Sequence, residues 1–213
     1  NIAHDLRTPL TRLRNKLDTL EDQTVSEELR GNIVLSLKEE ADGLLNIFNA
    51  LLRITNIESG QRNSQFQLVE LNTLLIDLVE LYEPLAAEKN QKLSLSVEPI
   101  NYCADGDLLF QALANIVDNA IKYTQVGGDI NISLEHSPKS VTIIIADNGI
   151  GIQSTDAAKL FQRFYRVEQS RNLPGNGLGL SLVKAVVNLH NGEISLQDNK
   201  PGLCVRLKLP IKS

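Results

Sequence analysis

The sequence predicts an α+β protein, in which an N-terminal helical hairpin is followed by an α/β sandwich. Apolar residues in the first sixty positions repeat at spacings of three and four, which is typical of helices that pack along a seam. After residues 62–64 the pattern changes to short alternating strands separated by amphipathic helices. We therefore expect one domain over residues 1–60 and a second over residues 64–213.

The hairpin is predicted from two heptad-like faces. The first helix places six apolar residues at a and d positions: Ala3, Leu6, Leu10, Leu13, Leu17 and Leu20. After a polar connection, Ser26 is the expected N-cap of a second helix that ends near Ile57. The apolar face of that helix comprises Ile33, Leu37, Leu44, Ile47, Phe48 and Leu51. Because one hairpin leaves part of these faces uncovered, we expect a homodimeric four-helix bundle.

The second region predicts alternating strands and helices in mixed order. Strands are expected over residues 66–71, 92–97, 130–134, 141–146, 193–196 and 203–209. Helices are expected over residues 74–88, 107–123 and 179–189, with a partly helical segment over 154–166. Such a mixture buries helices against one sheet and predicts an α/β sandwich.

Composition excludes several classes of function. The chain has 213 residues, 42% of them hydrophobic, and a net charge of −5, which disfavours nucleic acid or anionic lipid as partners. The longest apolar run, Val141–Ala146, falls far short of the roughly 20 residues that cross a bilayer, so no membrane contact is expected from these residues. Two cysteines, Cys103 and Cys204, exclude a disulfide framework and are expected, like Tyr102, in or near the core.

One histidine of the first helix lies in an unusual setting. His4 falls at the solvent-facing b position, with Asp5 beside it, Thr8 one turn further on, and Pro9 inside the helix. Imidazole is largely neutral and nucleophilic near pH 7, and a neighbouring carboxylate can accept the proton of its second nitrogen. The pattern suits covalent catalysis or a phosphoryl carrier, and an ordinary exposed histidine is the alternative.

A polar stripe on the predicted 107–123 helix is a candidate ligand site. Asn115, Asn119 and Lys122 share one face, and carboxamide oxygens with an ammonium suit a metal ion and phosphate. A solvated polar face is the alternative for this helix alone.

Asp147 ends a predicted strand and is followed by Gly149 and Gly151. The two glycines let the backbone approach a planar ligand closely, and the carboxylate can accept a hydrogen bond from an amine of that ligand.

A glycine-rich segment, residues 174–179, precedes the last predicted helix and forms a candidate anion cradle. It lacks the lysine of a Walker A loop, and its glycine spacing differs from that of a Rossmann fingerprint. The preceding stretch carries Arg163, Arg166 and Arg171 and resembles a lid that closes on phosphates.

Taken together, the sequence resembles the catalytic core of a sensor histidine kinase of a two-component system. Five segments match the family's motifs in order. They are the H box at His4–Leu10, the N box at Asn115–Tyr123, the first glycine box at Asp147–Gly151, the F box at Phe161–Arg166 and the second glycine box at Gly175–Gly179. The resemblance implies an ATP-binding domain of the gyrase, Hsp90 and MutL type and the cofactors ATP and Mg²⁺.

The resemblance also implies roles for individual residues. Asp147 would accept a hydrogen bond from the adenine amine. Asn119 with Asn115 would bind Mg²⁺, and Arg166 would reach the γ-phosphate. Lys122 and Tyr123 would contact phosphate or ribose. The remaining expected ATP-binding residues are Gly149, Gly151, Ile152, Phe164, Gly175, Gly177, Leu178, Gly179 and Leu180.

In the same family pattern, His4 takes the γ-phosphoryl group with Asp5 as general base, and the group passes to an aspartate of a response-regulator receiver domain. Asp5 and Thr8 also match the pattern linked to phosphatase action, so the resemblance implies a bifunctional enzyme. It further implies the cytoplasmic portion of a bacterial inner-membrane sensor protein.

Three other functions fit the sequence less well. A switch ATPase of the gyrase type needs a catalytic glutamate early in the N-box helix, and no glutamate lies between Glu98 and Glu135. A dimeric scaffold that binds nucleotide without transfer is disfavoured by Asn119, Asp147 and the lid glycines. A protein serine kinase of the same fold would not need the surroundings of His4.

Overall fold

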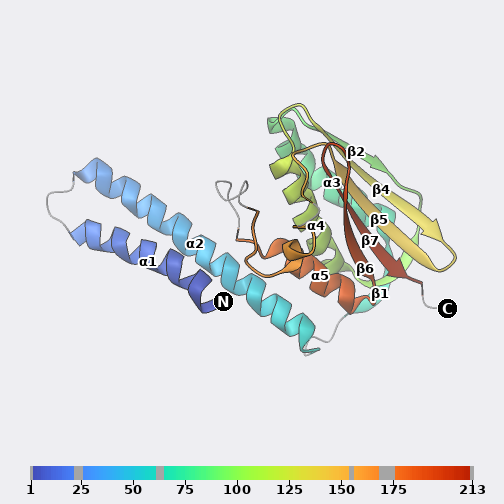
Figure 1. The fold of residues 1–213 in the computed structure, drawn as a ribbon, viewed down its shortest axis with the longest axis horizontal. Helices are drawn as coiled ribbons and strands as arrows, with labels where there is room; N and C mark the ends of the chain where they lie inside the picture. Colours follow the sequence, from blue (N-terminus) through green and yellow to red (C-terminus); the bar gives the residue numbers. More distant parts are fainter. Residues whose placement is uncertain (1, 22–25, 61–64, 154–155, 168–175, 212–213) are drawn as a thin grey trace. The chain divides into compact units, whose positions relative to one another are not determined.

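The computed structural model describes residues 2–21, 26–60, 65–153, 156–167 and 176–211. The chain divides into two compact units, residues 1–53 and residues 54–213 (Figure 1). Within the described residues, no helix is both long enough and apolar enough to span a membrane.

The first unit is the predicted helical hairpin. Helix α1 spans Ile2–Glu21 and helix α2 spans Glu27–Glu58. The hydroxyl of Ser26 accepts a hydrogen bond from the main-chain N–H of Leu29 at 3.3 Å, which confirms the predicted N-cap. Between the helices, Nζ of Lys16 bonds Oγ of Ser36 and Oε2 of Glu40, each at 2.7 Å.

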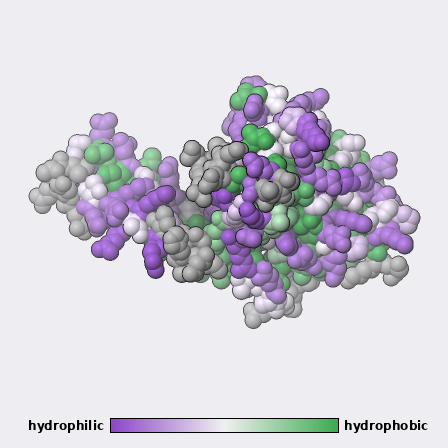
Figure 2. Space-filling model, in the orientation of Figure 1, coloured by the Kyte–Doolittle hydropathy of each residue, from purple (hydrophilic) through white to green (hydrophobic). Residues whose placement is uncertain are grey.

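Several apolar side chains of the hairpin remain exposed. Leu10 and Leu17 of α1 are 54% and 46% exposed. Phe48, which was expected on the apolar face of α2, is 56% exposed and lies with Leu45 and Leu52 on a second apolar stripe. Figure 2 shows apolar side chains at the surface of the hairpin among polar ones. The helices therefore carry more apolar surface than one hairpin covers.

The second unit is built on a five-stranded sheet with the order β2-β4-β5-β7-β6. Its strands are β2 Lys92–Ser96, β4 Asp129–Ser137, β5 Ser140–Asp147, β6 Glu193–Asp198 and β7 Leu203–Pro210. Strand β2 pairs parallel with β4, and the other pairs are antiparallel. Helices α3 Leu71–Glu88, α4 Gly106–Tyr123 and α5 Gly179–Leu189 cover one face of the sheet (Figure 1). This arrangement confirms the predicted α/β sandwich.

The core lies between the helices and the sheet. Leu109 and Leu113 of α4 and Ile143 of β5 are all 0% exposed. Burying each such side chain contributes about 1.5–3 kcal/mol relative to leaving it in water. The two elements that carry the N-box asparagines and Asp147 therefore both contribute to the buried core of the unit.

A second, two-stranded sheet was not predicted. Strand β1, Phe66–Glu70, pairs antiparallel with strand β3, Asn101–Asp105. Strand β3 places Tyr102 in the core as expected, but Cys103 points the other way and is exposed, so the expectation of a buried Cys103 is wrong. Successive side chains of a strand point to opposite faces of the sheet, so Tyr102 and Cys103 have different surroundings. The strand β3 was not predicted because its sequence is short and partly polar.

Two further differences concern helix bounds. Helix α3 begins at Leu71, three residues before its predicted start, and Leu71 is fully buried. Among the described residues of the segment expected to be partly helical, the only regular element is the short 3-10 turn Lys159–Phe161. The last turn of α2 belongs to the second unit, where Ile54 and Ile57 are buried and Glu58 pairs with Arg163.

Candidate functional site

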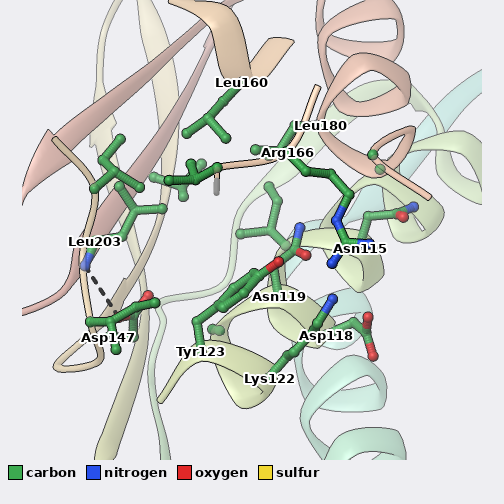
Figure 3. Close-up of a pocket in the computed structure, with 18 of the residues that line it drawn as sticks. Asn115, Asp118, Asn119, Lys122, Tyr123, Asp147, Leu160, Arg166, Leu180 and Leu203 are labelled. Carbon is green, nitrogen blue, oxygen red and sulfur yellow. Dashed lines mark hydrogen bonds between the residues drawn. The ribbon is translucent and has the colours of Figure 1, made fainter. Parts of the chain in front are cut away.

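The second unit contains a cavity of about 450 Å³ next to α4, the end of β5, the F-box segment and the start of α5 (Figure 3). Its polar wall is formed by Asn115, Asp118, Asn119, Lys122, Tyr123, Asp147 and Arg166. Its apolar lining includes Ile116, Ile145, Ile150, Ile152, Leu160, Leu180, Leu203 and Val205. A flat apolar group with a polyanionic tail matches both parts of this lining.

Helix α4 carries the asparagines of the site. Asp105 caps its N-terminus by accepting from the N–H of Leu108 at 3.1 Å. Nδ2 of Asn115 donates to the carbonyl of Gln111 at 2.8 Å, which fixes the amide in its assigned orientation. Its Oδ1 then lies beside Gly179, where an added Cβ would come within 3.0 Å of that oxygen. The glycine at the start of α5 thus leaves room for this carboxamide.

Asp147 is 6% exposed at the end of β5. Its Oδ1 accepts from the N–H of Gly149 at 2.9 Å and from the N–H of Leu203 at 3.2 Å (Figure 3). Burial raises the pKa of Asp147, while these two N–H groups lower it by stabilising the carboxylate. No described residue donates a hydrogen bond to Oδ2, so this oxygen can accept one from a ligand.

The turn after Asp147 is held by backbone contacts on two sides. Gly149 lies against the end of α4, where a Cβ would come within 2.4 Å of the carbonyl oxygen of Tyr123. Gly202 has φ +110° and lies so close to Asp147 that a Cβ would meet its carbonyl oxygen at 1.8 Å. Nδ2 of Asn199 donates to the same carbonyl at 2.7 Å. The β6–β7 hairpin therefore clamps the strand end that carries the carboxylate.

The F-box segment forms part of the cavity wall. The N–H of Phe164 donates to the carbonyl of Gly177 at 2.9 Å, and Gly177 has φ +69°. The side chain of Arg166 reaches into the cavity toward Asn115 (Figure 3). Tyr165 lines the cavity, whereas Phe164, which was expected to contact the ligand, does not.

Most of the sequence-predicted residues meet at this cavity. Those that line it are Asn115, Asn119, Lys122, Tyr123, Asp147, Gly151, Ile152, Arg166, Gly177, Gly179 and Leu180. Gly149 and Leu178 lie behind the lining, like Phe164, and Gly175 is outside the described residues. His4, Asp5 and Thr8 lie in α1, in the other unit.

Among the residues of the site that sequence reasoning missed, four come from one end of the sheet. They are Asn199, Gly202, Leu203 and Val205, from the β6–β7 hairpin and strand β7. The sequence predicts the two strands of this hairpin, at residues 193–196 and 203–209, but only the sheet order places the hairpin beside the end of β5. The pairing of Ala146 with Cys204 brings the two together.

Comparison with known families decides which family this chain belongs to. Residues 104–213 match the family described as histidine kinase-, DNA gyrase B- and HSP90-like ATPase. Residues 1–60 match the His Kinase A (phospho-acceptor) domain. The chain belongs to the histidine kinase family. The predicted catalytic core of a sensor histidine kinase is thereby confirmed, and the cavity lies in its ATPase-like domain.

A curated relative is similar to the whole chain. The Heme sensor protein HssS of Staphylococcus aureus strain Newman is 33% identical over 214 residues, which cover all of this chain and 46% of that protein. The chain thus spans about half the length of the curated relatives it matches.

Solved structures of histidine kinases have the same fold. Full-length ShkA in complex with AMPPNP matches with a TM-score of 0.75 at 25% identity, over 100% of this chain and 45% of that one. The histidine kinase ThkA, in complex with the response regulator protein TrrA, has a TM-score of 0.79 and shares the fold at 24% identity, over 99% of this chain and 60% of that one.

The donor set of this histidine kinase fits a hard divalent cation. The described residues hold no cluster of three or more histidine, cysteine or acidic side chains. The cavity instead offers the carboxamide oxygens of Asn115 and Asn119. Mg²⁺ is commonly held by one or two protein oxygens together with phosphate oxygens and water, and this set is suited to it.

Proposed function

We propose that this histidine kinase transfers the γ-phosphoryl group of ATP to His4 and then to an aspartate of a response-regulator receiver domain. The observation that supports this most strongly is the pairing of a phospho-acceptor domain, which contains His4-Asp5, with an ATP-binding cavity that gathers the predicted N-box and glycine-box residues. We place the domains at residues 1–60 and 64–213, and the two family matches support that division.

The cavity has residues suited to the adenine, the ribose and the phosphates of ATP. Oδ2 of Asp147 is positioned to accept from the adenine amine, since Oδ1 is already occupied by two N–H groups. Apolar side chains, including Leu160 and Leu203, would enclose the flat ring. Lys122 and Tyr123 would contact phosphate or ribose, and Arg166 would reach the γ-phosphate. Phosphoryl transfer needs mainly such positioning and charge neutralisation.

Asn119 and Asn115 would hold Mg²⁺ through their carboxamide oxygens. Bound there with the nucleotide, the ion would neutralise phosphate charge. The protein contributes the fixed amide of Asn115, which its hydrogen bond to Gln111 keeps turned toward α5.

On the acceptor side, His4 is the proposed nucleophile and Asp5 its general base. Helix α1 contains Pro9 one turn after Asp5, so its backbone lacks the hydrogen bond to the Asp5 carbonyl. We also propose that Asp5 and Thr8 support phosphatase action on the phosphorylated regulator, with Thr8 orienting the attacking water. The enzyme would then be bifunctional.

A homodimer is the proposed assembly. Leu10 and Leu17 on α1 are separated by seven residues, as are Leu45 and Leu52 on α2, and all four side chains are exposed. Stripes with this spacing pack against partner helices in coiled coils and four-helix bundles. A second hairpin would cover them.

The proposed partner in signalling is a receiver domain, as the ThkA–TrrA complex suggests by analogy of fold. We propose no nucleic-acid partner for this acidic chain and no membrane contact from these residues. Since the related HssS is a sensor protein about twice as long, we further propose the cytoplasmic portion of a bacterial inner-membrane sensor.

The test is to incubate the chain with γ-labelled ATP and Mg²⁺, follow label on the protein, and then add receiver domains. Label that accumulates and moves to a receiver supports the proposal. ATP hydrolysis without protein label would favour a switch ATPase instead. Nucleotide binding with neither label nor hydrolysis would favour a scaffold. The Asn119→Ala variant, which lacks a proposed Mg²⁺ ligand, should give neither label nor transfer.

A further inference from the structure

A hydrogen bond next to Arg166 has no part in the roles described above. The hydroxyl of Tyr165 donates to Oδ1 of Asp156 at 2.7 Å. Nζ of Lys159 lies 3.6 Å from the same oxygen and 6.0 Å from the centre of the Tyr165 ring. The Asp156 side chain is only 17% exposed. These three side chains form a small network across the 3-10 turn that precedes the F-box arginine.

The backbone of the same segment is also held, by Gly177. Phe164 has φ +64°, a conformation that non-glycine residues rarely adopt. It persists where surrounding contacts fix it, and here the N–H of Phe164 donates to the carbonyl of Gly177 at 2.9 Å. A Cβ on Gly177 would come within 2.8 Å of the carbonyl carbon of Phe164 and within 2.9 Å of the carbonyl oxygen of Tyr165. Gly177 therefore packs directly against this strained segment.

Arg166 follows immediately after these fixed residues. Its side chain extends from the F-box segment into the cavity and points toward α4 near Asn115 (Figure 3). A guanidinium group donates from a rigid planar fork, so its usefulness to a phosphate depends on its direction as well as its position. Arg166 follows Tyr165, whose backbone lies against Gly177 and whose hydroxyl donates to Asp156.

We propose that Asp156 and Tyr165 are positioning residues, which aim Arg166 at the terminal phosphate of ATP. Neither residue needs to touch that phosphate. The hydrogen bond holds the Tyr165 side chain against the 3-10 turn, and the arginine is thereby presented to the cavity already oriented. The inference rests on the proposed function in one respect, because that proposal assigns the γ-phosphate to Arg166.

The test compares the affinities of the chain for ATP and ADP by titration calorimetry with Mg²⁺. Tyr165→Phe removes one hydroxyl and keeps the ring. We expect it to reduce the affinity for ATP about three- to tenfold more than the affinity for ADP, and so to reduce the preference for ATP. Arg166→Ala should lose the same preference, and adding Tyr165→Phe to it should cause no further loss. Asp156→Ala should match Tyr165→Phe, while Asp156→Asn, which keeps an acceptor oxygen, should restore most of the preference.

Tyr102→Phe is the matched control. It removes another tyrosine hydroxyl, which donates to the carbonyl of Pro210 at 3.1 Å, and it should leave the ATP preference unchanged. Equal losses of ATP and ADP affinity in Tyr165→Phe, or a further loss in the Arg166→Ala background, would overturn the inference. So would a wild-type chain that binds ATP and ADP equally. Because this measurement needs no phosphoryl transfer, failure of the chain to label itself would count only against the proposed kinase activity.

Discussion

The main-chain N–H of Leu203 donates to Oδ1 of Asp147 across 3.2 Å, although 56 positions separate the two residues. The N–H of Gly149 donates to the same oxygen. Oδ1 is thus held by the backbone, whereas no described residue donates a hydrogen bond to Oδ2. Burial raises the pKa of Asp147 and the two N–H groups lower it by stabilising the carboxylate, and the proposed role of Oδ2 is to accept from the adenine amine.

Asp147→Asn should weaken ATP binding about tenfold or more, because a carboxamide cannot accept the adenine amine and both N–H groups as a carboxylate does. Equilibrium titration with a fluorescent ATP analogue measures the change. Asp77→Asn, an exposed substitution on α3, is the control and should bind as the wild type does. Unchanged affinity in Asp147→Asn would contradict the assignment of this residue to the adenine.

Gly202→Ala should disrupt the ligand site indirectly, by displacing the backbone at Asp147. Its φ of +110° disfavours any side chain, and the new Cβ would lie 1.8 Å from the carbonyl oxygen of Asp147. We expect a loss of about 2 kcal/mol or more in the free energy of unfolding, measured by urea titration, together with loss of ATP binding. Gly43→Ala is the matched control, since nothing lies within 4 Å of its Cβ position, and in a helix it should stabilise by about 0.5–1 kcal/mol.

His190 should make the stability of the ATP-binding unit depend on pH. It is 2% exposed, Nδ1 bonds the carbonyl of Val186 at 2.8 Å, and Nε2 accepts from the N–H of Asp105 at 3.1 Å. Burial lowers the pKa of His190 below 6.5, so the folded state favours the neutral ring. Stability should therefore be full above the unfolded pKa of about 6.5 and fall as the pH drops below it.

Urea titrations between pH 7.5 and 5 at about half-unit steps measure this dependence. His190→Gln, which cannot titrate, should flatten the decline. His136→Gln, on the exposed part of β4, should keep the wild-type profile. A wild-type slope in His190→Gln would show that another group carries the pH dependence.

Sequence reasoning recovered the parts of this molecule that depend on local pattern. The heptads of α1 and α2, the amphipathic α4 and the apolar β5 are all periodic, and each was found within a few residues of its bounds. It missed β3, which is five residues long and has polar Asn101 and Asp105 at its ends. It also missed the contribution of Leu203 and Gly202, because that depends on β7 lying next to β5 in the sheet.

The exposed apolar stripe of α2, formed by Leu45, Phe48 and Leu52, should determine how tightly the proposed homodimer associates. Phe48→Ser removes a large apolar side chain that is 56% exposed in the single hairpin and would be buried by a second copy. We expect the dimer dissociation constant, measured by analytical ultracentrifugation, to rise about tenfold or more. Lys38→Ser, an exposed polar change on the same helix, should leave it unaltered. A wild-type chain that sediments as a monomer at high concentration would contradict the proposed bundle.

The central proposal is that ATP bound in the cavity donates its γ-phosphoryl group to His4. The most direct measurement is to label the chain with γ-labelled ATP, test the label in acid and alkali, and locate it by peptide mapping, in parallel with His4→Gln. We predict label that is lost in acid, survives alkali, maps to the peptide containing His4 and is absent from His4→Gln. Acid-stable label, or label that persists in His4→Gln, would place the acceptor on another residue and contradict the account.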